Sequence, residues 1–174
     1  MRTTRVMVVG YGHVGKEAAL CVRQADDMEL AGIVDIRHRI NGDVGCPVVT
    51  GIHEIEALGQ VDVAILATPS RAVPSVAPSY LQKGINTVDC YDIHGDSLIS
   101  LRRDLHQQAE KGGSVAITTA GWDPGTNSIV RILFQAMAPR GLTYTNYGPG
   151  MSMGHTVAAK AIPGVRRCAV SNYT

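Results

Sequence analysis

The most telling stretch of the chain is Arg5-Val6-Met7-Val8-Val9-Gly10-Tyr11-Gly12-His13-Val14-Gly15, an apolar run that leads into the pattern G-x-G-x-x-G. Gly10 permits a tight turn from strand to helix, Gly12 lets backbone N–H groups approach a pyrophosphate, and Gly15 lets the helix pack on the strand. The phosphates then meet the positive end of a helix dipole. Asp35 ends the next apolar run, 20 residues after Gly15. That context predicts a dinucleotide site rather than a glycine-rich turn.

Composition narrows the class of protein. The chain has 174 residues, enough for one domain, or for one domain and the beginning of another. Hydrophobic residues make up 45% and the formal net charge is +1, without runs of like charge, so neither nucleic acid nor a membrane surface is an expected partner. The first apolar run is too short for a signal peptide, which predicts a cytoplasmic protein. Cys21, Cys46, Cys90 and Cys168 lack C-x-x-C or zinc spacing, so we expect reduced thiols and no metal site.

Strand-like apolar runs alternate with helix-like segments over the first part of the chain. Strands are predicted at Arg5–Val9, Glu29–Val34, Val61–Leu66, Asn86–Val88 and Ser114–Ile117. Helices are predicted at Val14–Ala25, Glu54–Leu58, Ala72–Lys83 and Asp96–Glu110. This alternation implies right-handed crossovers and a parallel sheet covered on both faces. The predicted fold class is therefore α/β, with a Rossmann-type doubly wound sheet over residues 1–120.

The loop after the second strand bears on the choice of cofactor. In a doubly wound sheet the ligand lies at the carboxyl ends of the strands. Asp35 is typical of a residue that accepts a hydrogen bond from the ribose 2′-OH of NAD, whereas Arg37, His38 and Arg39 suit the 2′-phosphate of NADP. The residues of this loop leave both cofactors open.

Two further loops follow strands and carry polar groups. In Ala67-Thr68-Pro69-Ser70-Arg71, which is expected to face the nicotinamide half, Thr68 or Ser70 can cap the next helix. The loop Val88-Asp89-Cys90-Tyr91-Asp92-Ile93-His94 holds two acids near the expected catalytic end. Asp92 is the favoured candidate, while Asp89 equally suits a helix cap or an acceptor for backbone amides, and His94 suits the surface.

The pattern changes after Ile117. The segment Thr118-Thr119-Ala120-Gly121-Trp122-Asp123-Pro124-Gly125-Thr126 holds the only Trp of the chain. Its Asp-Pro-Gly-Thr part either offers a carboxylate and N–H groups to a ligand or forms a rigid turn between domains. A helix at Asn127–Met137, a strand at Leu142–Tyr147, a glycine-rich loop at Gly148–His155 and a helix-like stretch at Thr156–Ile162 are predicted next. That glycine-rich loop suits a carboxylate ligand.

These motifs together carry a family resemblance. The segments GYGHVG (10–15), DCYDIHGD (89–96), AGWDPGTNSIVR (120–131), TYTNYGPGMSMGH (143–155) and AIPGV (161–165) resemble meso-diaminopimelate D-dehydrogenases over nearly the whole chain. The resemblance implies an NADP-dependent enzyme for the reversible oxidative deamination of the D-centre of meso-2,6-diaminopimelate to L-2-amino-6-oxopimelate and ammonia, in lysine and peptidoglycan-precursor metabolism. It also implies that residues 121–174 begin an α+β domain for substrate binding and homodimer formation.

The same resemblance assigns site residues. Asp92 and Asp123 would bind the substrate ammonium, and one of them would accept its proton, with the choice left open. The rest of the substrate site would be Trp122, Tyr147, Met153 and Gly154. The cofactor contacts would be Gly10, Tyr11, Gly12, His13, Val14, Gly15, Asp35, Arg37, His38, Ala67, Thr68, Pro69, Ser70, Cys90, Tyr91, Asp92, Ala120, Gly121, Trp122, Asp123 and Pro124.

Two departures from the family pattern keep alternatives open. The family usually has Ser or Arg where this chain has Asp35, so NADP is favoured but NAD stays an alternative. Family members also continue well beyond residue 174, which leaves a truncated dinucleotide-binding module without turnover as an alternative. A different Rossmann oxidoreductase, such as a dihydrodipicolinate reductase or homoserine dehydrogenase relative, would leave GWDPGT and GPGMSMGH unexplained.

Overall fold

The chain forms two compact units, Met1–Ser128 and Ile129–Thr174. The structure is a computed structural model that describes residues 2–36, 40, 44–93, 95–142, 150–152, 159–160, 162–168 and 170–172. Among these residues, no helix has the length and apolar character needed to cross a membrane.

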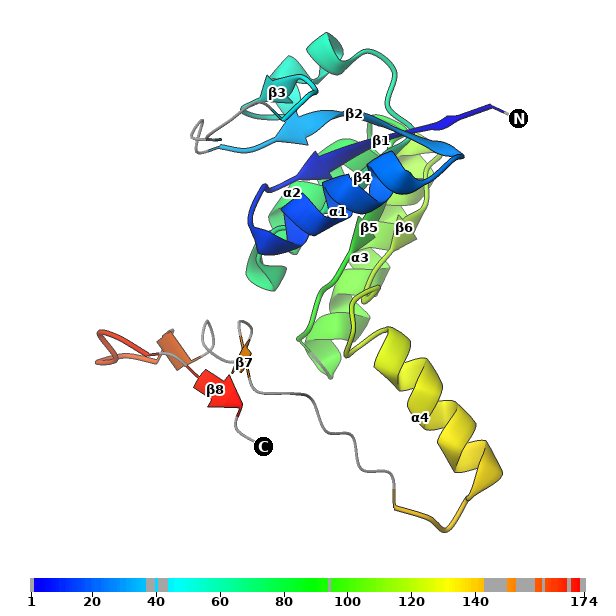
Figure 1. The fold of residues 1–174 in the computed structure, drawn as a ribbon, viewed down its shortest axis with the longest axis vertical. Coiled ribbons are helices and arrows are strands. Elements are labelled where there is room, and N and C mark those ends of the chain that lie inside the picture. The colour runs from blue at the N-terminus through cyan, green and yellow to red at the C-terminus, as the bar shows by residue number, and fades with distance from the viewer. Residues whose placement is uncertain are drawn as a thin grey trace. The chain divides into compact units, whose positions relative to one another are not determined.

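The first unit is built on a six-stranded parallel sheet (Figure 1). Its strands are β1 (Thr4–Val9), β2 (Met28–Val34), β3 (Val48–Val49), β4 (Val63–Leu66), β5 (Asn86–Asp89) and β6 (Ala116–Ile117). They lie in the order β3-β2-β1-β4-β5-β6, and every neighbouring pair is parallel. This is the strand order of a Rossmann fold, with the switch point between β1 and β4. The predicted fold class is confirmed for this unit, and each of the predicted strands within it is present.

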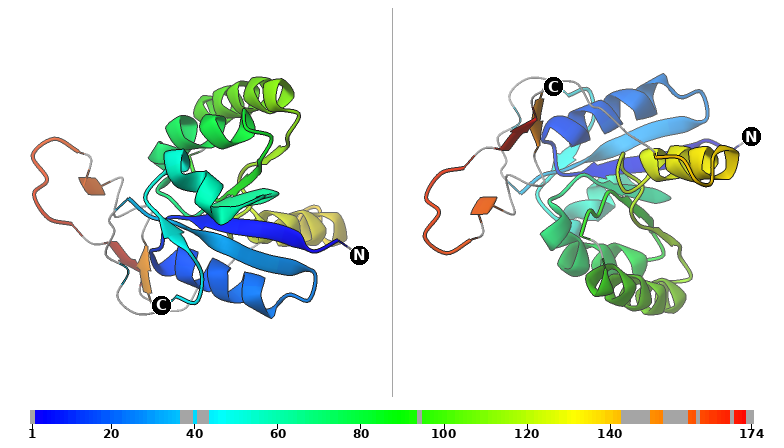
Figure 2. Two further views of the ribbon diagram at one scale, coloured as in Figure 1. Left: turned by 90° about the horizontal axis from the view of Figure 1, so that it is seen from above. Right: turned by 90° about the horizontal axis from the view of Figure 1, so that it is seen from below.

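Helices cover both faces of the sheet. They are α1 (His13–Gln24), η1 (Ile52–Leu58), η2 (Ser70–Ala72), α2 (Val73–Leu81) and α3 (Asp96–Gly112), and α4 (Thr126–Met137) follows the sheet. Helix α1 lies on one face, and α2 and α3 lie together on the other (Figure 2). The segment predicted as a helix at 54–58 is a 3₁₀-helix. Gly113 ends α3 in the left-handed region at φ +64°, where glycine carries no Cβ penalty.

The core fixes the strands beneath the site. Val6, Met7, Val8 and Val9 of β1 are all at least 94% buried, because a central parallel strand is covered on both faces. Met7 and Val9 belong to the cluster on the side of α2 and α3, which also contains Leu81. Burying each such side chain stabilises the fold by about 1.5–3 kcal/mol. The carboxyl ends of the strands are therefore held by packing rather than by their own loops.

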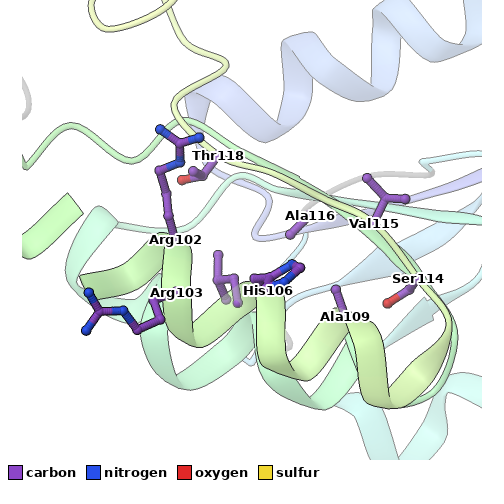
Figure 3. A pocket seen from close by; sticks show the side chains of 9 residues that line it. Arg102, Arg103, His106, Ala109, Ser114, Val115, Ala116 and Thr118 are labelled. Carbon is purple, nitrogen blue, oxygen red and sulfur yellow. The ribbon is translucent and has the colours of Figure 1, made fainter. Parts of the chain in front are cut away.

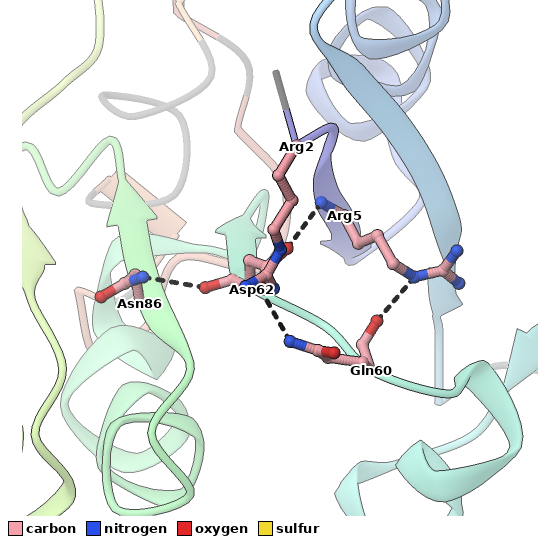
Figure 4. Close-up of polar contacts among 5 residues, drawn as sticks. All are labelled: Arg2, Arg5, Gln60, Asp62 and Asn86. Carbon is pink, nitrogen blue, oxygen red and sulfur yellow. Dashed lines mark hydrogen bonds and ion pairs between the residues drawn. The ribbon is translucent and has the colours of Figure 1, made fainter.

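A polar network ties the opposite, amino end of the sheet (Figure 4). The Asp62 carboxylate accepts a hydrogen bond from the Arg5 N–H at 2.9 Å and pairs with Arg2. The Asp62 backbone oxygen accepts from Asn86 Nδ2 at 3.0 Å, and Arg5 Nε donates to the Gln60 oxygen at 2.7 Å. These contacts join the amino ends of β1, β4 and β5, at the end of the sheet opposite the glycine loop.

Asp62→Ala is expected to lower stability without weakening dinucleotide binding. The change leaves the Arg5 N–H without its acceptor, which costs about 1–2 kcal/mol. Thermal unfolding should show the loss, and an NADPH titration should give an unchanged Kd. A weakened Kd would show that the two ends of the sheet are coupled.

The second unit contains a two-stranded antiparallel sheet of β7 (Gly150–Ser152) and β8 (Val170–Asn172). The prediction of a loop was wrong at 150–152, because this segment pairs with residues about 20 positions further along the chain, which no local pattern signals. Of the strand predicted at 142–147, residues 143–147 lie outside the described residues. Of the stretch predicted at 156–162, residues 159 and 160 are helical.

Candidate active site

Two glycines of the first loop are required by the packing of the chain itself. Gly10 has φ +90°, and a Cβ there would meet the Ala67 oxygen at 2.6 Å. A Cβ on Gly15 would meet the Gly10 oxygen at 1.9 Å. A side chain at Gly10 would therefore push apart the loops after β1 and β4, and a side chain at Gly15 would push α1 away from the strands.

Gly12 differs from both, because no described residue requires a glycine there. Its φ of −80° suits any residue, and a Cβ on it would meet no atom of the described residues within 4 Å. Gly12 is also the N-cap of α1, which has no side-chain cap and no acidic residue in its first turn. Backbone N–H groups at a helix N-terminus bind anions. The loop thus leaves open space beside uncapped N–H groups, which fits a pyrophosphate.

Asp35 fixes the backbone of the glycine loop through a hydrogen bond. It is 4% exposed, and its Oδ2 accepts a hydrogen bond from the Tyr11 N–H at 2.8 Å. Lys16 Nζ lies 5.8 Å from the centre of the Tyr11 ring, a cation–π distance that the sequence did not indicate. His13 and Val14 begin α1. The predicted contacts Arg37 and His38 lie outside the described residues.

The loop after β4 approaches both the glycine loop and the loop after β5. A Cβ on Gly10 would lie 3.4 Å from Thr68 Cγ2, and the buried Thr68 Oγ1 has no hydrogen-bond partner among the described residues. Ser70 Oγ accepts from the Asp92 N–H at 3.2 Å. The prediction that Thr68 or Ser70 caps the next helix was wrong: η2 follows Pro69 and has no side-chain cap. Ser70 instead holds the backbone of Asp92.

The end of β5 carries one buried acid and one exposed acid. Asp89 is 2% exposed, and its Oδ1 accepts from the Tyr91 N–H at 2.9 Å, so of its two predicted roles it takes that of acceptor for backbone amides. Tyr91 is itself 4% exposed and anchors the loop in the core. Asp92 is exposed, and its carboxylate makes no hydrogen bond to a residue that the structure describes. The Asp92 carboxylate is thus open to solvent.

Cys90 lies between these acids, and its surroundings disfavour the thiolate, which is the nucleophilic form. Burial raises the pKa of the Cys90 thiol, and the charges of Asp89 and Asp92 raise it further. Because the thiolate is the reactive form, Cys90 should be alkylated more slowly than the exposed Cys21 when iodoacetamide is added at pH 8. Peptide mass spectrometry after a short exposure measures both rates, and faster labelling of Cys90 would contradict the assignment.

The segment Gly121–Ser128 forms a tight turn that leads into α4. A Cβ on Gly125 would lie 1.8 Å from the Gly121 oxygen, and the Asn127 N–H donates to the Trp122 oxygen at 2.8 Å. Asn127 is 3% exposed, and its Nδ2 donates to Asp123 Oδ2 at 3.1 Å. The Asp123 carboxylate is therefore oriented, while Trp122 beside it is 56% exposed.

Backbone contacts bring the two candidate acids to adjoining segments. The Ala120 N–H donates to the Asp89 oxygen at 2.8 Å, and a Cβ on Gly121 would lie 3.1 Å from Cys90 Cβ. Asp92 follows Cys90 by two residues, as Asp123 follows Gly121. The predicted Tyr147, Met153 and Gly154 lie outside the described residues.

A groove of about 520 Å³ lies elsewhere, between α3 and the edge strand β6 (Figure 3). Arg102, His106 and Thr118 are among its lining residues. It contains none of the predicted site residues. The candidate site is therefore not this groove but the open region formed by the loops at the carboxyl ends of the strands.

Two family models match parts of this chain. Residues 121–174 match the family model of the diaminopimelic acid dehydrogenase C-terminal domain, and residues 1–93 match that of the CoA binding domain. A curated meso-diaminopimelate D-dehydrogenase of Bacteroides fragilis is 48% identical over 95% of this chain and 55% of its own length.

Solved structures give the same result. The C. glutamicum DAP dehydrogenase in complex with DAP has a TM-score of 0.78 at 34% identity, covering 96% of this chain and 51% of that one. An engineered D-amino acid dehydrogenase bound to NADP⁺ has a TM-score of 0.76 at 34% identity, covering 95% and 51%. The chain thus spans about half the length of the relatives it matches. Residues 1–93 place the chain in the CoA binding domain family, and along almost all of its length the chain is similar to meso-diaminopimelate D-dehydrogenases.

Proposed function

We propose that the protein is an NADP-dependent oxidoreductase that removes the amino group from the D-centre of meso-2,6-diaminopimelate. The observation that carries the proposal is the placement of Asp92 and Asp123 on adjoining segments at the sheet edge that bears the glycine loop. The relatives named for this substrate, and the neighbour bound to NADP⁺, support the same chemistry.

The residues of the first unit fit the cofactor. The open space at Gly12 and the uncapped start of α1 would hold the pyrophosphate, and Asp35 would fix the loop through Tyr11. The loops at 67–70, 90–92 and 120–124 would line the remainder. When bound, NADP supplies the acceptor for a hydride.

The two acids would prepare the substrate. Their carboxylates would bind the ammonium of the D-centre, and one would take a proton from nitrogen so that its lone pair becomes available. The Cα–H bond then breaks with loss of hydride, and a C=N bond forms. Water adds to this imine and ammonia leaves, which gives L-2-amino-6-oxopimelate. Trp122 would shield the amine from bulk water and so favour its neutral form.

The proposal extends to domains, assembly and location. Residues 1–120 would bind the cofactor and residues 121–174 would begin the substrate domain, where Tyr147, Met153 and Gly154 would contact the amino acid. Helix α4 exposes Ile129, Ile132, Leu133 and Phe134, which supports burial of this helix in a homodimer. Since its cofactor and substrate are metabolites, we place the enzyme in the cytoplasm.

The test follows NADPH formation at 340 nm with the purified 174-residue chain, meso-diaminopimelate and NADP. Turnover that is faster with NADP than with NAD supports the proposal. Faster turnover with NAD would show that the charge of Asp35, rather than that of the basic residues after it, determines which cofactor the chain prefers. Binding of NADPH by folded protein without any turnover would overturn the dehydrogenase proposal for this chain.

A further inference from the structure

We propose that Asp89 is a positioning residue whose buried carboxylate holds the loop bearing Asp92 against the segment bearing Asp123. The catalytic consequence of this inference rests on the proposed function. The hydrogen bonds of Asp89 that join the two segments, which we call the clamp, are a property of the fold. Asp89 would not touch the reacting atoms; it would act through the two exposed acids.

The contacts of Asp89 span both segments. Its Oδ1 accepts from the Tyr91 N–H at 2.9 Å within its own loop. The same oxygen accepts from Thr118 Oγ1 at 2.8 Å and from the Thr119 N–H at 3.4 Å, both on the segment after β6. Its backbone oxygen also accepts from the Ala120 N–H at 2.8 Å. One residue that is 2% exposed thus joins the two loops.

The segment after β6 needs such a clamp. Strand β6 is the edge strand and ends at Ile117, so the ladder with β5 stops before Thr118. Thr119 has φ +63°, a left-handed conformation that is unfavourable for a β-branched residue. Such conformations persist only where the surroundings impose them, and they gather at functional sites. The hydrogen bond from the Thr119 N–H to Asp89 is one such constraint.

Close packing of the residues that lie between Asp89 and the two acids also holds the segments together. Gly121 approaches Cys90 so closely that an added Cβ would lie 3.1 Å from Cys90 Cβ. Ser70 holds the Asp92 N–H at 3.2 Å from the side of β4. The backbone of the segments that carry Asp92 and Asp123 is therefore held in place. The Asp89 carboxylate lies at the contact between these two segments. A displacement of about 1 Å between reacting groups costs about 100-fold in rate.

The first test reads the clamp without any activity. Trp122 is the only Trp of the chain, so quenching of its fluorescence by acrylamide reports on the segment that carries Asp123. Asp89→Ala should increase this quenching, and the amide hydrogens of Tyr91 and Thr119 should exchange about ten-fold faster. Asp62→Ala is the matched control, since it also removes a carboxylate that accepts a backbone N–H, but at the opposite end of the sheet.

The second test reads the catalytic consequence. Asp89→Ala should lower kcat for meso-diaminopimelate about 100-fold, with KM changed far less, and should weaken NADPH binding by much less than this factor, because the glycine loop makes no hydrogen bond with Asp89 among the described residues. Asp89→Asn keeps an acceptor oxygen and should recover part of the rate, and Thr118→Val should lie between the two. Asp62→Ala should leave kcat unchanged.

The outcomes separate the two proposals. Absence of turnover in the wild type would overturn the proposed function, and the quenching and exchange measurements would still test the clamp. Unaltered quenching and exchange in Asp89→Ala, or a kcat no lower than that of Asp62→Ala, would overturn the role of Asp89. If Asp89→Ala does not fold, Asp89→Asn and Thr118→Val carry the same comparison.

Discussion

Gly12→Asp is expected to abolish dinucleotide binding and to leave the protein folded. Gly12 is the N-cap of α1 with ordinary backbone angles, and within the part of the chain that the structure describes, a Cβ there would meet no atom within 4 Å. Aspartate is a favoured N-cap residue, so the helix should gain rather than lose stability. Its carboxylate would, however, occupy the space proposed for the pyrophosphate. Two unit charges about 4 Å apart near a protein surface repel by about 4 kcal/mol, which corresponds to about 1,000-fold in Kd.

Titration of NADPH fluorescence measures this loss, with thermal unfolding as the check on the fold. Gly12→Asn adds a side chain of the same size without charge and should weaken binding less than Gly12→Asp. The difference between the two variants isolates the negative charge of the ligand. Unchanged affinity in Gly12→Asp would show that the phosphates do not lie at this helix terminus.

Gly15→Ala should behave in the opposite way. The added Cβ would lie 1.9 Å from the Gly10 oxygen, so α1 must move away from the strands. The melting temperature should fall, and cofactor binding should fall only as a consequence. We therefore expect the two glycines to be separable, with Gly15 needed for the fold and Gly12 for the proposed ligand.

The sheet was predictable because its strands are buried on both faces. Val6–Val9 and Ile33–Val34 read as continuous apolar runs, and each is followed by a glycine or an acid. Strand β3 was missed, because its two residues, Val48 and Val49, are too few to form a pattern. It exists because β2 offers an edge, where Ile33 and Val34 pair with it.

The candidate site, like the sheet, has one part that the sequence could predict and another part that it could not. The glycine loop is local chemistry, so Gly10, Gly12 and Gly15 could be assigned roles from spacing alone. The partners of Asp89 could not, because Thr118 lies 29 residues away and meets it only through the pairing of β5 with β6. The contact of Ser70 with Asp92 crosses 22 residues in the same manner. An acid directly after a buried strand, with a Thr pair after the next strand, is the signal that could have indicated this clamp.

Asp92→Asn and Asp123→Asn should each lower kcat/KM for meso-diaminopimelate while the protein continues to bind NADPH. Both acids are exposed beside the loops that we propose to hold the cofactor, and the proposed mechanism needs one to take a proton and both to hold the ammonium. Loss of general-base catalysis costs about 100- to 10,000-fold in rate. The amide keeps the shape of the side chain, so the comparison isolates charge and basicity.

The variant that loses kcat should identify the base, and the variant that mainly raises KM should identify the binding acid. Asp123 is already oriented by Asn127 at 3.1 Å, whereas the Asp92 carboxylate has no hydrogen bond to a described residue. A fixed carboxylate suits the binding of an ammonium, and a carboxylate presented to solvent is easier to reprotonate, so we expect the larger fall in kcat for Asp92→Asn. Asp104→Asn on the exposed face of α3 is the control, since it changes the same charge outside the site. Near-normal kcat/KM in both site variants would mean that the proton goes to another group and that the two acids are structural.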